Sequence, residues 1–413
     1  MEKKEKDLKK LKSDFKKNRL TGLCRKACYV LPTIFLIAFV LGANLTVYAD
    51  EKTDVTGGED TGYESETDLE NNGENESMVE MVNYGVTDVD MEAAPRIVPD
   101  EEDVLMAIPS SYDSRRYGNV TSVKNQNPYG TCWSFATISA LESSLLSHDI
   151  MGNPDLSELH LIRYSFNNIG DDPLGGTKGD KITFLGTDMR YQGGNGLTNF
   201  HALANWRGAT PESYAPYSGN VGEVSMDDAY NHDTVHLQQF YRISWQDVNY
   251  VKQAIMSYGA IGQSFYYDKS YLNKKTSAYF TDKPAGTSTN HSICIVGWND
   301  NYSRKNFAIN PGRDGAWLVK NSWGTSFGQN GYCWISYAEP TFYRDCGVYV
   351  GELANNYDNN YQYDGCYTSA SITPSGSNRA VSNVFTVKGN KRQQLKAVSI
   401  ELISAQADYS IQI

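Results

Sequence analysis

Four side chains from three separate segments of the sequence have the types needed for acyl transfer through a thiol. Cys132 lies where a helical pattern begins, Gln126 precedes it by six positions, and His291 and Asn321 follow much later. A cysteine attacks as its thiolate, and a helix N-terminus and an adjacent imidazolium both lower the pKa of a thiol. The side-chain amide of Gln126 and the backbone N–H of the nucleophile would form a donor pair for an oxyanion. Cys132 is therefore a candidate nucleophile, although a small residue buried at a helix start has the same appearance.

His291 is the strongest candidate among the six histidines for a base beside that thiol. It begins an apolar, strand-like run directly after the polar loop 282–290, whereas the others lie in helical stretches or polar segments. Asn321, at the end of a later strand-like run, can fix the tautomer and orientation of an imidazole. Trp323 can cover that hydrogen bond and exclude water from it. Ordinary roles stay open as well, since a strand histidine is commonly structural and an asparagine shortly before a glycine is common in turns.

The elements that must position these groups divide into a helical part and a later β part. Apolar residues first recur at helical spacing, and later runs are rich in β-branched and aromatic residues bounded by Gly, Asn or Asp. This order predicts an α+β domain rather than alternating βαβ units. The expected helices are 133–146, 156–166, 199–207 and 246–259, and the expected strands are 260–267, 291–299, 315–323 and 331–337.

The first 49 residues predict export. Residues 1–28 are strongly basic, and the apolar run that follows ends in Val47-Tyr48-Ala49. This pattern is typical of a secretory signal peptide cleaved after Ala49, with an uncleaved membrane anchor as the alternative. Either alternative places the rest of the chain outside the cytoplasm, in the extracellular space or at the cell surface, with membrane contact only through this segment. Residues 50–107 are acidic and poor in large apolar side chains, which predicts a disordered leader or propeptide.

Charge and cysteine content narrow the partners. The 413 residues carry a net charge of −12, which argues against a nucleic-acid partner. Five cysteines follow the export segment, so at least one thiol is expected to be free. The pairing of the four that follow Cys132 stays open: Cys294, Cys333, Cys346 and Cys366. No spacing resembles a metal-binding cysteine set, and no metal or organic cofactor is implied.

The chain is expected to contain more than one folded unit. The folded character begins near residue 108, and we expect the first domain to occupy 108–349. Residues 350–381, rich in Asn, Tyr, Gly and Ser, read as a connection. Three strand-like runs follow at 382–389, 394–403 and 408–413. A β-sandwich needs about seven strands, so residues 382–413 predict the start of a sandwich that continues beyond the sequence.

Three segments resemble the papain family of cysteine peptidases, in the same order along the chain. QNPYGTCWSFA resembles the nucleophile segment of that family, NHSICIVGWN its histidine strand and VKNSWGTSFGQNGY its asparagine segment. Weaker matches, LSELHL, GGNG and WRGATPESYAPY, fall where the family would place them. The resemblance covers roughly residues 108–345. It implies a two-lobed fold with a helical lobe and a β-barrel-like lobe.

The resemblance also implies a secreted cysteine endopeptidase that forms and then hydrolyses a thioester. It assigns Cys132 as the nucleophile, His291 as the acid and base, and Asn321 as the residue that orients the imidazole. Gln126 becomes the oxyanion donor. The expected partners are polypeptide substrates, and no cofactor enters the mechanism.

Substrate-binding roles follow from the same resemblance. Gly193 and Gly194 line the cleft and hydrogen-bond the backbone of the bound peptide, and Trp323 shields the His–Asn pair. The family usually has a second cysteine three residues before the nucleophile, bonded to one beside the glycine loop. Tyr129 and Tyr191-Gln192 occupy those places here, so packing must hold the two loops together. The tail after residue 350 resembles the lectin-like β-sandwich of some bacterial extracellular members, which implies a cell-wall or glycan ligand.

Two other functions stay open. The chain could be a catalytically inactive surface adhesin, a glycan- or protein-binding module on a peptidase-like fold. It could also be a related Cys-His enzyme such as a transglutaminase or a cell-wall amidase. A Cys-His core serves those enzymes too, but they need neither the spacing from Gln126 to Cys132 nor the NSWG segment. Cleavage of casein, as opposed to crosslinking or lysis of cell walls, separates these functions.

Overall fold

The computed structural model describes residues 37–40, 108–166, 188–218, 224, 232–243, 248–342, 346–362, 393 and 395–400. The acidic leader and nearly all of the predicted export segment lie outside these residues. Ile37–Val40 (β1) pairs with Ala397–Ile400 (β11) in a two-stranded sheet. Of the three strand-like runs near the C-terminus, 394–403 contains β11, and the other two lie outside the described residues. No helix in the described part of the chain is long and apolar enough to span a bilayer.

Four helices confirm the expected helical part. They are α2 (Cys132–Ser147), α3 (Glu158–Phe166), α4 (Gly196–Ala204) and α5 (Val248–Tyr258). Only α4 is displaced, beginning and ending three residues before the prediction. It begins early because the Asn195 side chain accepts from the backbone N–H of Thr198 at 3.1 Å, which caps the first turn. It ends early because Trp206 adopts a left-handed backbone conformation (φ 59°).

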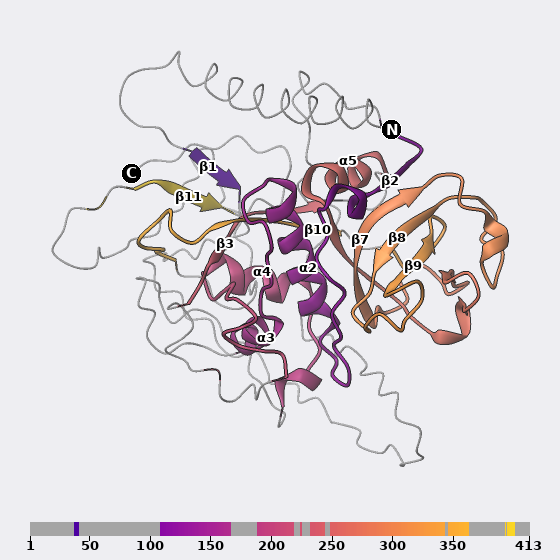
Figure 1. Cartoon of the computed structure of the whole chain (residues 1–413), viewed down its shortest axis with the longest axis horizontal. Coiled ribbons are helices and arrows are strands. Elements are labelled where there is room, and N and C mark those ends of the chain that lie inside the picture. Colours follow the sequence, from indigo (N-terminus) through magenta and orange to yellow (C-terminus); the bar gives the residue numbers. More distant parts are fainter. Residues whose placement is uncertain are drawn as a thin grey trace, which may run out of the picture. The chain divides into compact units, whose positions relative to one another are not determined.

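The strands form one nine-stranded mixed sheet. The strands of this sheet are β2 (Ser111–Asp113), β3 (Val235–Ile243), β4 (Ile261–Phe265), β5 (Leu272–Asn273), β6 (Ala278–Tyr279), β7 (His291–Asn299), β8 (Ala316–Lys320), β9 (Tyr332–Ser336) and β10 (Cys346–Leu353). Their order is β3-β10-β4-β7-β8-β9-β6-β5, and β2 pairs with β7. The β6–β9 pair is parallel, and the other pairs in this sheet are antiparallel. The four strands expected from the sequence, β4, β7, β8 and β9, are consecutive neighbours in this sheet. Figure 1 shows β7, β8 and β9 side by side.

Strands β3 and β10 were not expected. The segment of β3 contains His236 and two glutamines, and these polar residues interrupt the apolar pattern by which a strand is predicted. It forms because β10 pairs with it along its whole length, from Cys346 opposite Ile243 to Leu353 opposite Val235. Strand β10 therefore continues four residues past 349, into the segment that was expected to be a connection.

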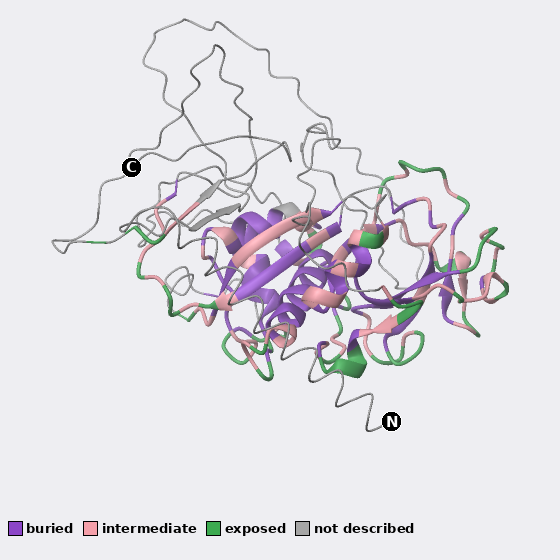
Figure 2. Cartoon of the chain, turned by 90° about the horizontal axis from the view of Figure 1, so that it is seen from above, coloured by how far each residue is buried: buried purple, intermediate pink, exposed green. Residues whose placement is uncertain are grey.

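Helix α2 is the central element of the fold. Every residue from Cys132 to Leu145 is buried, although the helix contains several serines and a glutamate. One apolar core joins α2 to α3, α4, β3 and β10, and a second lies between α5 and the strands β4, β7, β8 and β9. Figure 2 shows the central helices and strands as mostly buried, with exposed residues mainly in the loops. The small side chains of α2 let strands and helices approach it closely, and its first residue is the candidate nucleophile.

Candidate active site

Cys132 is the first residue of α2, as its position in the sequence predicted. Thr131 precedes it at the N-cap, but the Thr131 side chain does not cap the helix. Its hydroxyl instead lies 2.6 Å from that of Tyr217. The backbone N–H groups of Cys132 and Trp133 reach the sulfur and favour its thiolate form. The helix start therefore places both donor groups and a positive dipole end at the thiol.

His291 begins β7 and is held by Asn321, which directly follows β8. His291 Nε2 lies 2.8 Å from Asn321 Oδ1. The backbone N–H of Ser322 donates to the same oxygen at 2.8 Å, which identifies Oδ1 as the acceptor. Because Oδ1 accepts, Nε2 carries the imidazole proton, and Nδ1 is left as the basic nitrogen. The sequence-predicted partners are thus brought together, with the tautomer that a general base needs.

The Trp323 ring packs on the His291 imidazole. The two rings are stacked, with centroids 4.4 Å apart and an angle of 22° between the planes. Tyr267 and Phe327 pack edge-on against the indole, at 4.8 Å and 5.0 Å. His291 and Asn321 are each only 4% exposed. The hydrogen bond between them is therefore screened from water, which strengthens it.

The thiol lies beside Ser292, the residue that follows His291. The backbone N–H and the hydroxyl of Ser292 donate to the Cys132 sulfur. Burial nevertheless raises the pKa of the Cys132 thiol to about 11, and it lowers the pKa of His291 to about 4. The lowered thiol pKa expected from the helix start is therefore outweighed by desolvation in this state. A lone charge on either group is unfavourable, so we expect the two to ionise together, as the proton passes from sulfur to nitrogen.

Gln126 is fixed at both ends of its side-chain amide. Its Nε2 donates to the Tyr129 carbonyl at 2.8 Å, and its Oε1 accepts from the Ser322 hydroxyl at 2.6 Å. The backbone bridge between Asn125 and Trp323 brings these two segments together, with the Gln126 N–H donating to the Ser322 carbonyl at 2.8 Å. A primary amide has two N–H donors, so one remains for a ligand. The geometry suits an oxyanion donor.

Gly193 and Gly194 lie just before α4, and glycine is favoured by the backbone angle at the first and by close packing at the second. Gly193 has a φ of 72°, which side-chain-bearing residues rarely adopt. A Cβ on Gly194 would lie 2.6 Å from ring carbons of Trp133, the residue after the nucleophile. The glycine loop is therefore packed directly on the start of α2.

Packing does hold the two loops that have tyrosines in place of cysteines. The rings of Tyr129 and Tyr191 meet edge-on, with centroids 5.2 Å apart. Cys132, Cys294 and Cys333 are free thiols, and the Cys346 thiol donates to the Ile243 carbonyl. Cys366 lies outside the described residues.

Several residues of the site were not singled out from the sequence. Ser322 joins Asn321 to Gln126, Ser292 contacts the thiol, and Tyr217 bonds the loop before it. Ser322 and Ser292 lie inside the segments NSWG and NHSIC, and Tyr217 ends the segment WRGATPESYAPY. The only sign in the sequence that these residues belong to the site was their position within those segments. Their contacts depend on segments that meet only in the folded chain.

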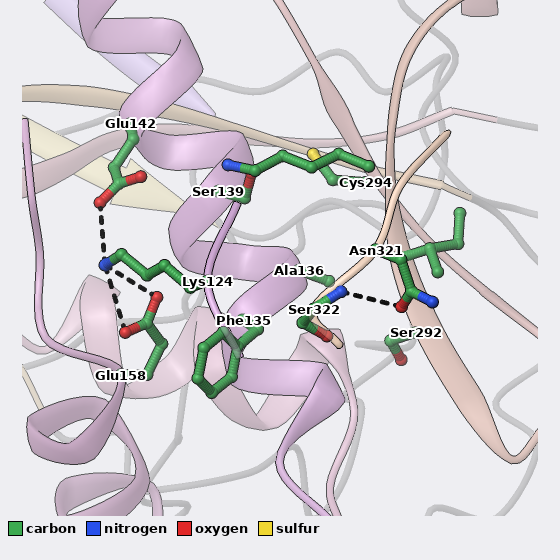
Figure 3. A pocket seen from close by; sticks show the side chains of 12 residues that line it. Lys124, Phe135, Ala136, Ser139, Glu142, Glu158, Ser292, Cys294, Asn321 and Ser322 are labelled. Carbon is green, nitrogen blue, oxygen red and sulfur yellow. Dashed lines mark hydrogen bonds and ion pairs between the residues drawn. The ribbon is translucent and has the colours of Figure 1, made fainter. Parts of the chain in front are cut away.

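Acidic side chains cluster around Lys124, and two of them, Glu142 and Glu158, are buried (Figure 3). Lys124 Nζ lies 3.0 Å from Asp155, 3.1 Å from Glu158 and 3.4 Å from Glu142. Burial alone would lower the pKa of Lys124, but the carboxylates around it raise the pKa above its ordinary value. The cluster borders a cavity of about 20 Å³, which has room for about one water molecule and also touches Ser292 and Asn321. The charges thus line the same cavity as Asn321, which holds the imidazole.

Replacing Lys124 with methionine should destabilise the protein strongly. The change leaves Glu142 and Glu158, whose side chains are 1% and 2% exposed, without their cation. Removing one partner of a buried ion pair costs about 3–5 kcal/mol of unfolding free energy, which urea denaturation measures. Arg304→Ala is the control, because its ion pair with Asp314 is exposed and should leave the urea midpoint nearly unchanged. Equal midpoints for the two variants would contradict the expectation.

No group of three or more His, Cys, Asp or Glu side chains among the described residues is arranged to hold a metal ion. The chemistry that this arrangement can perform is that of the side chains themselves. It consists of a thiol at a helix start, an imidazole with a free basic nitrogen, and an amide donor.

Comparison with known proteins gives a consistent result. Residues 108–354 match the family model for papain family cysteine proteases. Fruit bromelain from Ananas comosus is 27% identical over 252 residues, which cover 60% of this chain and 61% of that protein. Cathepsin S from Bos taurus is 27% identical over 241 residues, which cover 58% of this chain and 63% of that protein.

Two solved structures of Cwp84 are also similar. The clostridial cysteine protease Cwp84 after propeptide cleavage is 30% identical, with a TM-score of 0.51 over 60% of this chain and 59% of that one. A structure of the cysteine protease and lectin-like domains of Cwp84, described as a surface layer associated protein of Clostridium difficile, is 28% identical, with a TM-score of 0.50 over 64% of this chain and 54% of that one. The chain thus spans about three fifths of the length of such relatives.

Proposed function

This chain belongs to the papain family of cysteine proteases, and from that premise we propose that it is an endopeptidase acting through Cys132, His291 and Asn321. Gln126 supplies an oxyanion donor. The observation that carries the proposal is the 2.8 Å contact between His291 Nε2 and Asn321 Oδ1, which leaves the basic nitrogen of a buried imidazole for the thiol at the start of α2. The substrates are polypeptides.

In the proposed mechanism the Cys132 proton passes to Nδ1 of His291 as the sulfur attacks a peptide carbonyl carbon. The carbonyl oxygen becomes an oxyanion, which accepts from the Gln126 amide and the Cys132 backbone N–H. His291 then returns the proton to the amine of the leaving peptide, and the C–N bond breaks to give a thioester. A water molecule loses a proton to the same imidazole and hydrolyses the thioester, which releases the second peptide and restores the thiol. Asn321 stays neutral and holds the ring throughout.

Substrate binding is assigned to the glycine loop. Gly193 and Gly194 offer backbone donors and acceptors without side chains between them and an extended peptide. Trp323 keeps water from the His291–Asn321 hydrogen bond while the substrate lies alongside. In this assignment Gly193, Gly194 and Trp323 take no direct part in bond breaking.

We also propose that the protein works outside the cytoplasm, as a secreted or surface protease. The basic and apolar pattern of residues 1–49 supports this proposal, and the surface-layer description of Cwp84 agrees with it. The residues from 382 onward are proposed to begin a lectin-like domain that binds a glycan or cell-wall component. The similarity to a Cwp84 structure that contains such a domain supports that assignment.

The competing function is that of an inactive surface adhesin or binding module. It would leave the buried His291–Asn321 pair, the correct tautomer and the doubly fixed Gln126 amide without a purpose. The contact of the Cys132 thiol with Ser292, the residue that follows His291, therefore favours the enzyme.

The test combines turnover with thiol labelling. Purified protein is incubated with casein under reducing conditions, and the products are read by mass spectrometry. Peptides that gain one water at each cut, and a single epoxysuccinyl inhibitor adduct located on Cys132, are the expected results. Intact casein and an unlabelled Cys132 in protein shown to be folded would favour the binding module. Crosslinked casein, with loss of ammonia, would indicate a transglutaminase.

Replacing Asn321 with alanine should shift the pH dependence as well as lower the rate. Burial lowers the pKa of His291 to about 4, and the Asn321 hydrogen bond opposes this by raising it. Its removal lowers the pKa of His291 further, so the acid limb of kcat/KM moves to lower pH while the plateau value falls. The measurement is kcat/KM against pH, with Asn290→Ala as a control that contacts Tyr267 rather than the imidazole. An acid limb that moves to higher pH would contradict this assignment.

A further inference from the structure

The same short structural motif occurs twice in the described part of the chain, and one copy lies beside the proposed site. In each copy an aspartate N-caps a 3-10 helix and binds the arginine two positions later, whose guanidinium lies over a tyrosine ring. Asp113, Arg115 and Tyr332 form one copy. Arg115 is the second residue of η2 (Ser114–Tyr117), and its guanidinium carbon lies 4.4 Å from the centroid of the Tyr332 ring. Such a fork holds a planar guanidinium in a fixed orientation.

The second copy starts from Asp188, at the N-cap of η3 (Met189–Tyr191). The Asp188 carboxylate accepts from the backbone N–H of Arg190 at 2.9 Å, from its Nε at 3.0 Å and from its Nη2 at 2.6 Å. The two side chains are only 22% and 12% exposed. The Asp188 carboxylate therefore fixes the orientation of the Arg190 guanidinium.

Arg190 makes two contacts with the loop that precedes the nucleophile. Its guanidinium carbon lies 3.9 Å from the centroid of the Tyr129 ring, and its backbone carbonyl accepts from the Gly130 N–H at 3.0 Å. Tyr191, the next residue, meets the same tyrosine edge-on. The segment held in this way ends two residues before Cys132, and η3 itself ends two residues before Gly193.

Tyr129 passes this constraint on to the Gln126 amide. Its carbonyl accepts from Gln126 Nε2 at 2.8 Å, and its N–H donates to the Gln126 carbonyl at 3.0 Å. The Tyr217 hydroxyl also donates to the Gln126 carbonyl, at 2.7 Å. A displacement of the Tyr129 ring would rotate the Tyr129 carbonyl, which orients the Gln126 side-chain amide.

We propose that Arg190 is a positioning residue for the oxyanion donor Gln126. It fixes Tyr129 and Gly130 against the glycine loop, so that the remaining N–H of the Gln126 amide points at the position of the oxyanion. This inference rests on the proposed peptidase function. In this assignment Arg190 acts through the loop rather than on the reacting atoms.

Kinetics of Arg190→Ala test the role, with Arg115→Ala as the matched control from the other copy of the motif. The expected result for Arg190→Ala is a fall in kcat of about 10–100-fold on a peptide substrate, because a displacement of about 1 Å has effects of that order. Alkylation of Cys132 by iodoacetamide, which forms no oxyanion, should stay within about two-fold of wild type. Arg190→Lys should recover only part of the loss, since an ammonium neither forks nor stacks as a guanidinium does. Arg115→Ala should keep the wild-type kcat.

A double-mutant cycle separates positioning from a general loss of structure. In a Gln126→Ala background the effect of Arg190→Ala on kcat should shrink to less than about three-fold, because both changes remove the same donor. Two outcomes would overturn the positioning role while the wild-type protein remains active and the peptidase proposal stays intact. One is full additivity of the two substitutions, and the other is an equal kcat for Arg190→Ala and Arg115→Ala. Wild-type protein that cannot hydrolyse peptides would overturn the peptidase proposal instead.

Hydrogen exchange tests the contact independently of activity. Amides of the segment 126–131 should exchange faster in Arg190→Ala than in Arg115→Ala, because the ring contact that holds Tyr129 is lost. Unchanged exchange in this segment would show that Arg190 does not hold the loop.

Discussion

Alanine at position 132 is expected to lower kcat for peptide hydrolysis by at least roughly 10⁴-fold, the scale seen when a covalent nucleophile is removed. The remaining imidazole and amide donor bind substrate but have no sulfur with which to form the thioester. The thiol is 4% exposed and makes its contacts with Ser292 and backbone donors, so its loss leaves a small defect in packing rather than an unpaired charge. Labelling by an epoxysuccinyl inhibitor should disappear with the activity.

Cys333→Ala is the matched control for this result. Cys333 is also a buried free thiol, on β9 within the second apolar core, and burial raises its thiol pKa to about 12. Its replacement removes a buried sulfur without touching the site, so turnover and labelling should persist. Retained hydrolysis in Cys132→Ala, or loss of labelling in Cys333→Ala with Cys132 intact, would show that the nucleophile has been misassigned.

Alanine in place of Gln126 is expected to lower kcat by about 10²–10³-fold, or about 2.7–4 kcal/mol, with a smaller change in KM. The amide stabilises charge that develops only on the oxyanion, so the substrate complex loses little. Its two fixed ends, on the Tyr129 carbonyl and the Ser322 hydroxyl, mean that the donor is held in place before the reaction. Stopped-flow or steady-state kinetics with a fluorogenic peptide measure both constants.

Gln126→Glu sharpens the experiment because it keeps the shape of the side chain and replaces its N–H donors with a carboxylate. We expect it to be at least as slow as Gln126→Ala, since a negative charge would face the oxyanion. Gln329→Ala, on an exposed loop where the side chain bonds the Thr276 carbonyl, should behave as wild type. Iodoacetamide should alkylate Cys132 at similar rates in all three variants. A normal kcat in Gln126→Glu would exclude the amide from oxyanion binding.

Much of the fold could be predicted from local patterns. The helices around 133–146, 156–166 and 246–259 and the strands around 260–267, 291–299 and 331–337 appear close to their expected bounds because their apolar periodicity is strong. Strand β3 could not be predicted in this way. Its glutamines are acceptable in a strand because only part of each side chain is covered, and its pairing partner β10 lies more than 100 residues away.

The amino-acid sequence by itself determined the types and order of the reacting groups: a cysteine at a helix start, a histidine opening a strand and an asparagine closing another. These depend on local geometry, which neighbouring residues specify. Only the tertiary structure decided how the groups act on one another. The Ser322 N–H fixes Asn321 Oδ1 as the acceptor and thereby the tautomer of His291, and burial moves the thiol and imidazole pKa values apart. Arg190 meets Tyr129 across about sixty residues of chain. Such contacts depend on which segments the sheet and α2 bring together, and on how much water they exclude, and no local pattern encodes either.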